Sequence, residues 1–525
     1  MKKTVQDLLS LAEETFKRQH PMLGLYQTLA DHFYPERADF LHARNVGAEL
    51  ADYLVDSYPI LVRRDLANSF HAMLRDGDWF QISVEGGEPD YQGKLWLDWA
   101  SRRQLAMMNA RSTGFVRSTK EGDHDYATFG QTVLSTEINR RRSGYLYRCW
   151  HLRDCAWWDD VNGETCGVVR KWSPTRRDMV DYFGEDAVSP NVTKDVKREP
   201  FKEVNVRHIF MPSEMYGDDE IASKFKYVSL FVDMDNQHLI EEIGLDHKIY
   251  TIPRFQTVSG SPYAYSPATV AGLPNARVLQ AITHTLLEAG ERYARPPIVA
   301  TQKVIRGDID LSPDGITWVD NEYDEKMGAS LRPIFQDRGG FPIGQDMRQG
   351  VAEVLASAFY VDKLSLPDKS NMTAYEVSEY MKQYRRQNLP LFAPMEAEYN
   401  GALCENTFEL GMSAGFFGSP YDIPESLRGQ NVKFEFKSPL SESEQEKQST
   451  QFQMISGLLA DAANFDPNVV MNVNFDEAIR DAIEGTGAPD KWLNDIEQVM
   501  QGRQAAMMQQ AAMAAAEMGV PMNGE

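Results

Sequence analysis

The chain has 525 residues, of which 42% are hydrophobic and 25% are charged, as is typical of folded globular proteins. Its 77 acidic residues outnumber 54 basic ones, so the formal net charge is −23. These values exclude a disordered, collagen-like or mostly membrane-embedded chain, and they argue against a protein that coats nucleic acid.

Four cysteines are present and form no CxxC pair: Cys149, Cys155, Cys166 and Cys404. We therefore expect reduced thiols rather than a zinc site or a disulfide framework. Charged residues return early in the N-terminal MKKTVQDLLSLAEE, and no apolar stretch is long enough to span a bilayer. The sequence thus predicts a protein kept in the cytosol, with no secretory leader and no membrane contact.

The first third predicts helices followed by mixed structure. A helical stripe begins at Val5 and is interrupted by Pro21, and a second closes at Pro35. A third helical pattern covers 50–74, and alternation predicts a strand over 80–84. Residues 95–120 read as a basic helix, 174–183 as a short helix, and 145–150, 166–172 and 204–210 as strands.

The middle of the chain predicts two helices around a small β-rich module. Apolar residues at helical spacing run from Val278 to Tyr293, and Pro296-Pro297 ends that helix. Residues 298–335 read as strands and turns. A second helix begins near Gly344, so we expect an antiparallel pair, a stalk with a tip.

The last third predicts a long kinked helix and an acidic helical end. Thr373 and Glu376 form a capping box, and the helical stripe continues to about Gly415 with Pro390 and Pro394 inside it. Residues 432–436 alternate as a strand. Residues 501–525 are rich in Ala, Met and Gln, which suits either a frayed tail or a helix that neighbouring chains bury.

No catalytic constellation is apparent. The sequence contains no P-loop, GxSxG elbow or HExxH helix. His238, Glu241, Glu242 and His247 lie close together, and we interpret them as a solvated helix face. Asp310 and Asp314 partly match a calcium loop, but the surrounding residues favour a β-turn. We expect no metal, no cofactor and no enzyme activity. A metal-dependent enzyme using scattered carboxylates remains a remote alternative.

Several ordered stretches resemble the portal protein family, the head-to-tail connectors of short-tailed bacteriophages. They are ANSFHAMLRDGDWFQISVE (67–85), WWDDVNGETCGVVRKWSPTRRDMVDYFG (157–184), YSPATVAGLPNARVLQ (265–280), GVAEVLASAFYVDKLSLPDKSNMTAYEVSEYM (350–381) and VKFEFKSPL (432–440). Together they span most of residues 20–450. No single stretch is as specific as a metal-binding motif, so the resemblance rests on their order.

The resemblance implies an α+β, predominantly helical, portal-type subunit with a wing, two stem helices, a small β-rich clip and a helical crown. The implied regions are the wing at 1–274, stem helix 1 at 275–295, the clip at 296–343, stem helix 2 at 344–365, the channel loop at 366–372, a long kinked wing helix and strand at 373–439, the crown at 440–500 and a tail or barrel helix at 501–525.

The resemblance also implies a ring, a homododecamer at one capsid vertex, that passes double-stranded DNA during packaging and ejection. Its partners would be the terminase large subunit, capsid and scaffolding proteins, and tail or adaptor proteins, with assembly in the host cytoplasm. Implied channel-loop residues are Pro367, Asp368, Lys369, Ser370, Asn371 and Met372. Basic channel-lining candidates are Arg292, Arg295 and Lys363. Clip docking candidates are Arg306, Asp310, Asp314 and Trp318. The alternative is another virion structural protein, such as a tail adaptor or an internal core protein.

Overall fold

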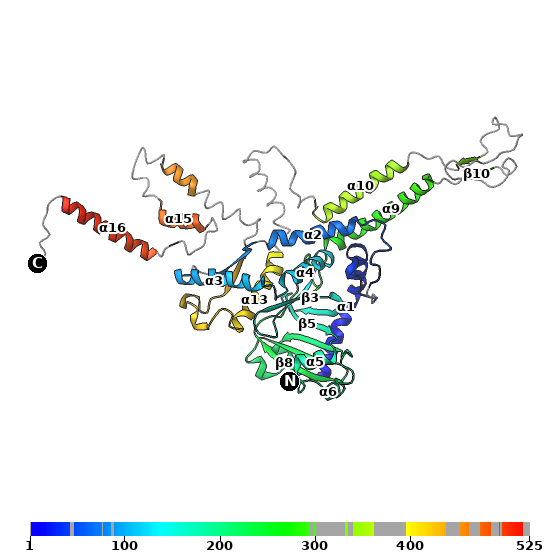
Figure 1. The fold of residues 1–525 in the computed structure, drawn as a ribbon, viewed down its shortest axis with the longest axis horizontal. Coiled ribbons are helices and arrows are strands. Elements are labelled where there is room, and N and C mark those ends of the chain that lie inside the picture. Colours follow the sequence, from blue (N-terminus) through cyan, green and yellow to red (C-terminus); the bar gives the residue numbers. More distant parts are fainter. Residues whose placement is uncertain are drawn as a thin grey trace.

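The computed structural model describes residues 2–42, 47–75, 77–85, 89–294, 298–300, 331–333, 340–361, 395–436, 452–460, 473–484, 493 and 496–517. Helices and strands alternate through a central body, from which a helical hairpin projects (Figure 1). This mixture, with helix predominating, confirms the predicted α+β class.

The longer helices are α1 (Val5–Phe33), α2 (Tyr58–Leu74), α3 (Tyr91–Met108), α4 (Phe115–Phe129), α9 (Leu273–Ala294), α10 (Gly340–Ala358), α13 (Ala402–Ser413), α15 (Phe475–Glu484) and α16 (Ile496–Glu517). Short helices are α5 (Arg176–Phe183), α6 (Pro190–Asp195), α7 (Ser213–Tyr216) and α8 (Asp219–Ala222). Single 3₁₀ turns are η1 (Pro35–Arg37), η2 (Leu152–Asp154), η6 (Pro420–Asp422) and η7 (Glu425–Leu427), whereas η3 (Ala268–Gly272) and η5 (Glu396–Gly401) are π-helical. A further helical segment covers 452–460.

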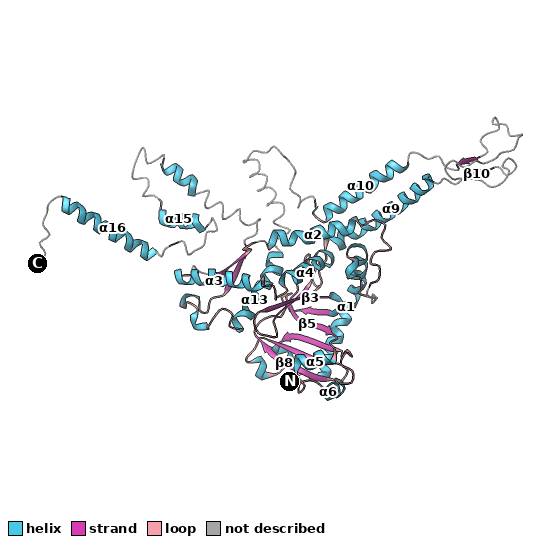
Figure 2. Ribbon diagram, in the orientation of Figure 1, coloured by secondary structure: helices cyan, strands magenta, loops and turns pink. Residues whose placement is uncertain are grey.

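An antiparallel five-stranded sheet has the order β4-β5-β6-β7-β8. Two of its strands, β5 and β8, are labelled in Figure 2. Its strands are β4 (Cys155–Asp159), β5 (Thr165–Trp172), β6 (Val206–Pro212), β7 (Tyr227–Asp233) and β8 (His238–Leu245). A three-stranded sheet of order β3-β2-β9 consists of β2 (Val133–Ile138), β3 (Tyr145–Trp150) and β9 (Tyr250–Thr251). The β-branched and aromatic residues that fill these strands suit a pleated, half-buried surface.

Two further pairs join distant segments. β1 (Phe80–Val84) pairs with β12 (Val432–Phe436), so that Phe80 lies opposite Phe436 and Ile82 opposite Phe434. The Phe80 and Phe434 rings lie 5.6 Å apart in an edge-to-face arrangement. β10 (Ile298–Ala300) pairs with β11 (Leu331–Pro333). The strands predicted at 80–84 and 432–436 are therefore confirmed.

The predicted interruption at Pro21 is wrong, because α1 continues through it. The proline removes one backbone hydrogen bond and costs about 3 kcal/mol. However, Leu8 packs on the five-stranded sheet and Tyr26 and Phe33 lie in the largest core cluster, all three fully buried. Burying each such side chain contributes about 1.5–3 kcal/mol, so packing on both sides of the proline outweighs its penalty.

Three other predictions need correction. Residues 50–57 are not helical, because α2 begins only at Tyr58, with Pro59 in its first turn. The single helix predicted over 95–120 is two helices, separated before Phe115 by Gly114 in a left-handed conformation (φ 71°). The helix face expected around His238 is strand β8, where pairing with β7 outweighs the local helical pattern.

Candidate functional site

The projecting hairpin of α9 and α10 is the candidate site, because it lies at the two predicted stalk helices. The two helices run side by side away from the body (Figure 1). Leu286 of α9 packs over Gly344 of α10, where a Cβ atom would lie only 2.6 Å from the leucine side chain. The glycine therefore permits the close approach of the two helices.

The base of the hairpin is set in the main core. Leu279 of α9, and Leu355 and Phe359 at the end of α10, are fully buried. The Phe359 ring lies 5.4 Å from that of Phe33 at the end of α1. Hence both helices are fixed at their body end by the same apolar cluster.

A polar cluster, the Asp56 anchor, ties the same region to the loop before α2. It consists of Asp56, Gln280, Thr283 and Arg348. Arg348 donates from Nε and Nη2 to Asp56 Oδ2 at 3.0 and 2.7 Å, and Thr283 Oγ1 donates to the same oxygen at 3.0 Å. Asp56 is only 6% exposed, so one carboxylate joins α9, α10 and the body in a partly buried setting.

Gln280 completes the anchor through the backbone. Its Oε1 accepts from the amides of Val55 and Asp56, both at 2.9 Å, and its Nε2 donates to the Asp56 carbonyl at 2.6 Å. The backbone groups of Val55 and Asp56 thus form hydrogen bonds with Gln280 of the hairpin instead of bonds within a helical turn. This explains why the helical pattern at 50–57 is not realised.

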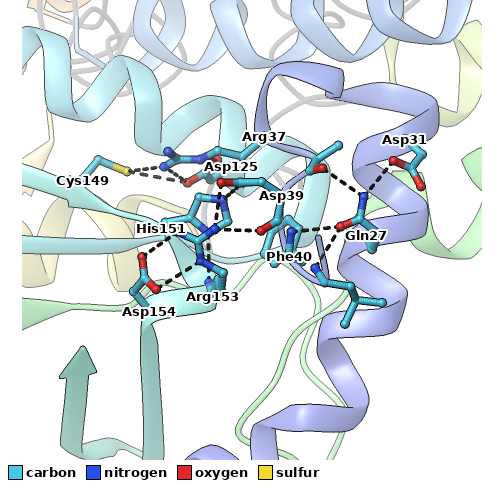
Figure 3. A network of polar contacts seen from close by, with 12 residues as sticks. Gln27, Asp31, Arg37, Asp39, Phe40, Asp125, Cys149, His151, Arg153 and Asp154 are labelled. Atoms are coloured by element: carbon cyan, nitrogen blue, oxygen red, sulfur yellow. Dashed lines mark hydrogen bonds and ion pairs between the residues drawn. The ribbon is translucent and has the colours of Figure 1, made fainter. Parts of the chain in front are cut away.

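The start of the loop that follows η1 is fixed to the body at Asp39 (Figure 3). His151 Nε2 donates to Asp39 Oδ1 at 2.6 Å, and Arg153 Nη1 donates to Oδ2 at 2.9 Å. Burial alone would raise the pKa of Asp39, but the hydrogen bond from His151 and the charges of His151 and Arg153 lower it to about 2. Asp39 therefore stays ionised and holds the start of the loop.

Two neighbouring contacts reinforce this attachment. Gln27 Oε1 on α1 accepts from the Phe40 amide at 2.9 Å, and Arg37 forms a two-pronged pair with Asp125 on α4 at 3.1 and 2.8 Å (Figure 3). The Asp125 side chain is fully buried. The start of the loop is thus held to α1, α4 and the strand that precedes His151.

Another buried ion pair holds the segment that begins at Met395 to the body. Arg75 Nη1 donates to both oxygens of Asp123 at 2.9 and 2.8 Å, and its Nε donates to Asn400 Oδ1 at 2.9 Å. Its guanidinium lies 4.4 Å from the centroid of the Tyr399 ring. Asn400 and Tyr399 belong to the π-helix η5, so this pair fixes η5 and α13 to α2 and α4.

Of the site residues implied by the resemblance, Arg292 lies within the described residues. It is in the last turn of α9, its side chain is 72% exposed, and its Nη2 lies 3.7 Å from Glu288 Oε2. The remaining candidates lie outside the described residues: Arg295, Lys363, Arg306, Asp310, Asp314, Trp318, Pro367, Asp368, Lys369, Ser370, Asn371 and Met372.

Sequence reasoning missed the Asp56 anchor. Asp56 Oδ1 accepts from the Tyr58 amide at 3.0 Å, so its position just before a Tyr-Pro helix start was a visible local signal. Its contacts with Thr283 and Arg348 cross 227 and 292 positions, and no local pattern in one sequence encodes such partners.

The described part of the chain holds no group of three or more His, Cys, Asp or Glu residues that could bind a metal ion. Within the same residues, no helix has the length and apolar character needed to cross a membrane.

Comparison with known proteins matches this chain to a family and to several similar proteins, of which two are given. Residues 5–493 match the family of bacteriophage head to tail connecting proteins. A portal protein from Salmonella phage epsilon15 is 23% identical over 467 residues, which cover 84% of this chain and 79% of the relative. A chain from the virion of a native gene transfer agent particle covers 75% of this chain and 85% of its own length at 10% identity, and its TM-score of 0.37 is too low to support an argument.

Proposed function

The chain belongs to the family of bacteriophage head-to-tail connecting proteins, a family of structural virion components, and on this premise we propose that it forms the portal ring of a phage capsid. The ring would occupy one vertex and pass double-stranded DNA during packaging and ejection. It would bind the terminase large subunit first and tail or adaptor proteins later.

The observation that carries the proposal is the exposed apolar surface of the projecting hairpin. On α10, Ile343, Met347 and Val354 are 63%, 57% and 54% exposed. Their spacing of four and seven residues puts them on one helical face. On α9, Val278 and Leu287 are 46% and 57% exposed. An apolar face on a projecting element marks a protein contact, and the hairpins of neighbouring subunits would cover it in a ring.

The portal assignment also implies how the subunit is divided into regions. α9 and α10 correspond to the stem helices, the segment between them to the clip, and the body before α9 to the wing. Residues 366–372 would be the channel loop, and the helical segments from 452 onward the crown and tail. In a ring, a heterologous interface closes on itself, and the attachment of both stem helices to one core and one carboxylate supports a fixed stem angle.

The charge of the chain suits a DNA channel. With a net charge of −23, an acidic lumen wall would repel phosphates, so that duplex DNA would slide instead of adhering. Sparse basic residues would contact the duplex transiently, with Arg292, Arg295 and Lys363 as stem candidates and Lys369 as the channel-loop candidate. Arg306, Asp310, Asp314 and Trp318 would contribute to the docking face of the clip.

Native mass spectrometry combined with negative-stain imaging tests the proposal. We expect a ring, dodecameric by the family resemblance, with a central hole. The protein should be tested alone and after co-expression with its capsid and scaffolding proteins, since some connectors assemble only with scaffold. A chain that stays monomeric under both conditions contradicts the proposal.

Deleting residues 297–342 tests the clip assignment separately. The anchor, α9 and all but the first three residues of α10 would remain, so rings should still form, whereas binding of the terminase large subunit should be lost. Undiminished terminase binding by this deletion variant would contradict the clip assignment while leaving the ring itself in place.

A further inference from the structure

A rigid basic turn stands out on this acidic protein. The turn between β2 and β3 exposes Arg140, Arg141 and Arg142, which we call the arginine tip. Asn139 builds the turn, because its Oδ1 accepts from the Ser143 amide at 2.9 Å and its carbonyl accepts from the Arg142 amide at 2.8 Å. Arg142 has a left-handed backbone (φ 51°), which costs about 1–2 kcal/mol in a residue other than glycine. The turn therefore presents the guanidinium groups of Arg141 and Arg142 on a fixed backbone frame.

A groove of about 1120 Å³, the acidic groove, lies at the β4–β5 turn and the start of β7. Trp158 and Phe225 form apolar walls. Each ring lies directly on a glycine of the sheet. A Cβ atom on Gly167 would lie 1.9 Å from the Trp158 ring, and one on Gly244 would lie 2.2 Å from the Phe225 ring. The two aromatic faces are thus held in place before any partner arrives.

Carboxylates outnumber ammonium groups in the acidic groove. It is lined by five acidic residues and three lysines, and Glu405 and Glu409 lie beside it on the exposed face of α13. Burial raises the pKa of both glutamates, and the charge of Glu409 raises that of Glu405 further, whereas Lys226 and Lys248 oppose the effect at Glu409. Lys248 lies 3.6 Å from Glu164 and Arg254 lies 3.4 Å from Asp159, so these cations offset part of the negative charge. The acidic groove therefore can bind further positively charged side chains.

The two features lie at opposite ends of the five-stranded sheet. β5 begins at Thr165, in the acidic groove, and ends at Trp172, whose ring packs on Tyr182 of α5. Arg140 of the arginine tip donates to the Asp181 carbonyl of α5. The eight residues of β5 span roughly 26 Å, so the tip cannot fold back into the groove of its own chain.

We propose that the arginine tip of one subunit docks in the acidic groove of the next copy of this chain. Guanidinium groups pair with carboxylates in two-pronged contacts and stack on aromatic faces, and the groove offers both kinds of partner. Two different complementary patches on one subunit are what a heterologous, ring-forming interface needs. The inference rests on the proposed ring and identifies a contact in it that lies outside the stem hairpin.

Charge reversal tests the contact. The tip variant is Arg141→Glu with Arg142→Glu, and the groove variant is Glu164→Lys with Glu409→Lys. Each should raise the subunit concentration needed for ring formation by about tenfold or more, because each puts like charges opposite one another. The chain that carries all four substitutions should form rings at nearly the wild-type concentration. Arg111→Glu with Arg117→Glu is the matched control, since it makes the same charge change on other exposed residues.

Proximity gives a second readout. Cys166 lines the acidic groove and is a free thiol. In assembled rings, Arg141→Cys should become joined to Cys166 of the neighbouring copy by a short bis-maleimide linker, and Cys166→Ser should abolish that cross-link. Peptide mass spectrometry identifies the pair.

The outcomes separate this contact from the proposed function. If the wild-type chain forms no ring alone or with its scaffold, both the proposed function and this inference fail. If the wild-type and both reversed variants form rings equally well, only this inference fails. This inference also fails if the chain with all four substitutions forms rings as poorly as the tip variant and the groove variant do. If the tip variant forms normal rings but has lost affinity for duplex DNA, the arginine tip binds DNA phosphates, and the proposed contact between subunits is overturned.

Discussion

Removal of the Asp56 carboxylate should loosen the projecting hairpin of α9 and α10 at its base. In Asp56→Ala, Arg348 loses two charge-assisted hydrogen bonds and Thr283 loses one. A hydrogen bond to a charged group contributes about 1.5–3 kcal/mol. The Arg348 side chain is 40% exposed, so water replaces part of the loss, and we expect the hairpin to lose about 2 kcal/mol.

Hydrogen exchange measures this loss locally. A decrease of about 2 kcal/mol in the opening free energy corresponds to a roughly 30-fold faster exchange of the amides around Thr283 and Arg348. The control is Asp65→Ala, because the Asp65 side chain is 56% exposed and lies 4.0 Å from Arg64. That substitution should change exchange by less than about twofold.

A double-mutant cycle with Arg348→Met isolates the pairwise interaction between Asp56 and Arg348. Residues in one polar network show coupling energies of about 0.5–3 kcal/mol, and we expect a value of at least about 1 kcal/mol. A coupling near zero, or hairpin exchange in Asp56→Ala no faster than in the control, would refute the role assigned to the Asp56 anchor.

Three further predictions concern other parts of the chain. Asp123→Asn should destabilise the protein by about 3–5 kcal/mol in urea unfolding, because it leaves the Arg75 guanidinium buried without its counter-charge; a loss below about 1 kcal/mol would show that the pair is dispensable. Burial and the charge of Arg63 lower the pKa of His124 from 6.5 to about 4. The unfolded chain therefore binds this proton first, and stability should fall by up to about 3 kcal/mol as the pH drops from 6.5 to 4. His124→Asn should remove that part of the pH dependence, and an unchanged slope contradicts the assignment. Lys369→Glu should leave ring formation intact but alter DNA packaging or genome retention, and wholly normal packaging, retention and ejection would argue against the channel-loop assignment.

Local patterns predicted those elements whose signal lies within a few residues. The alternation at 80–84 and the stripe from Val278 onward each identify one element, and both are present in the structure. Patterns failed where a tertiary contact outweighed them. Pro21 lies inside α1 because packing on both sides of it continues the helix, and His238 lies in a strand because β7 is available as a partner.

The candidate site was predictable as a pair of helices but not as an anchored unit. Their helical periodicity is visible in the sequence, whereas the contacts of Asp56 with Thr283 and Arg348 depend on the tertiary fold. The acidic groove likewise combines a turn, a strand start and a helix that lie far apart in the chain. The three consecutive arginines of the tip were visible in the sequence, but their fixed turn and their distance from the groove were not.

The β1–β12 pair makes the body depend on the order of synthesis. Ser83 and Lys433, which this pair brings together, are 350 positions apart. At about 5–20 residues per second, β1 waits roughly 20–70 seconds for its partner strand to be translated. The core cluster around Trp79 and Phe434 therefore closes only after α9 and α10 have been made. A chain that ends before residue 432 lacks β12, so its β1 has no partner strand and the core cluster around Trp79 stays incomplete.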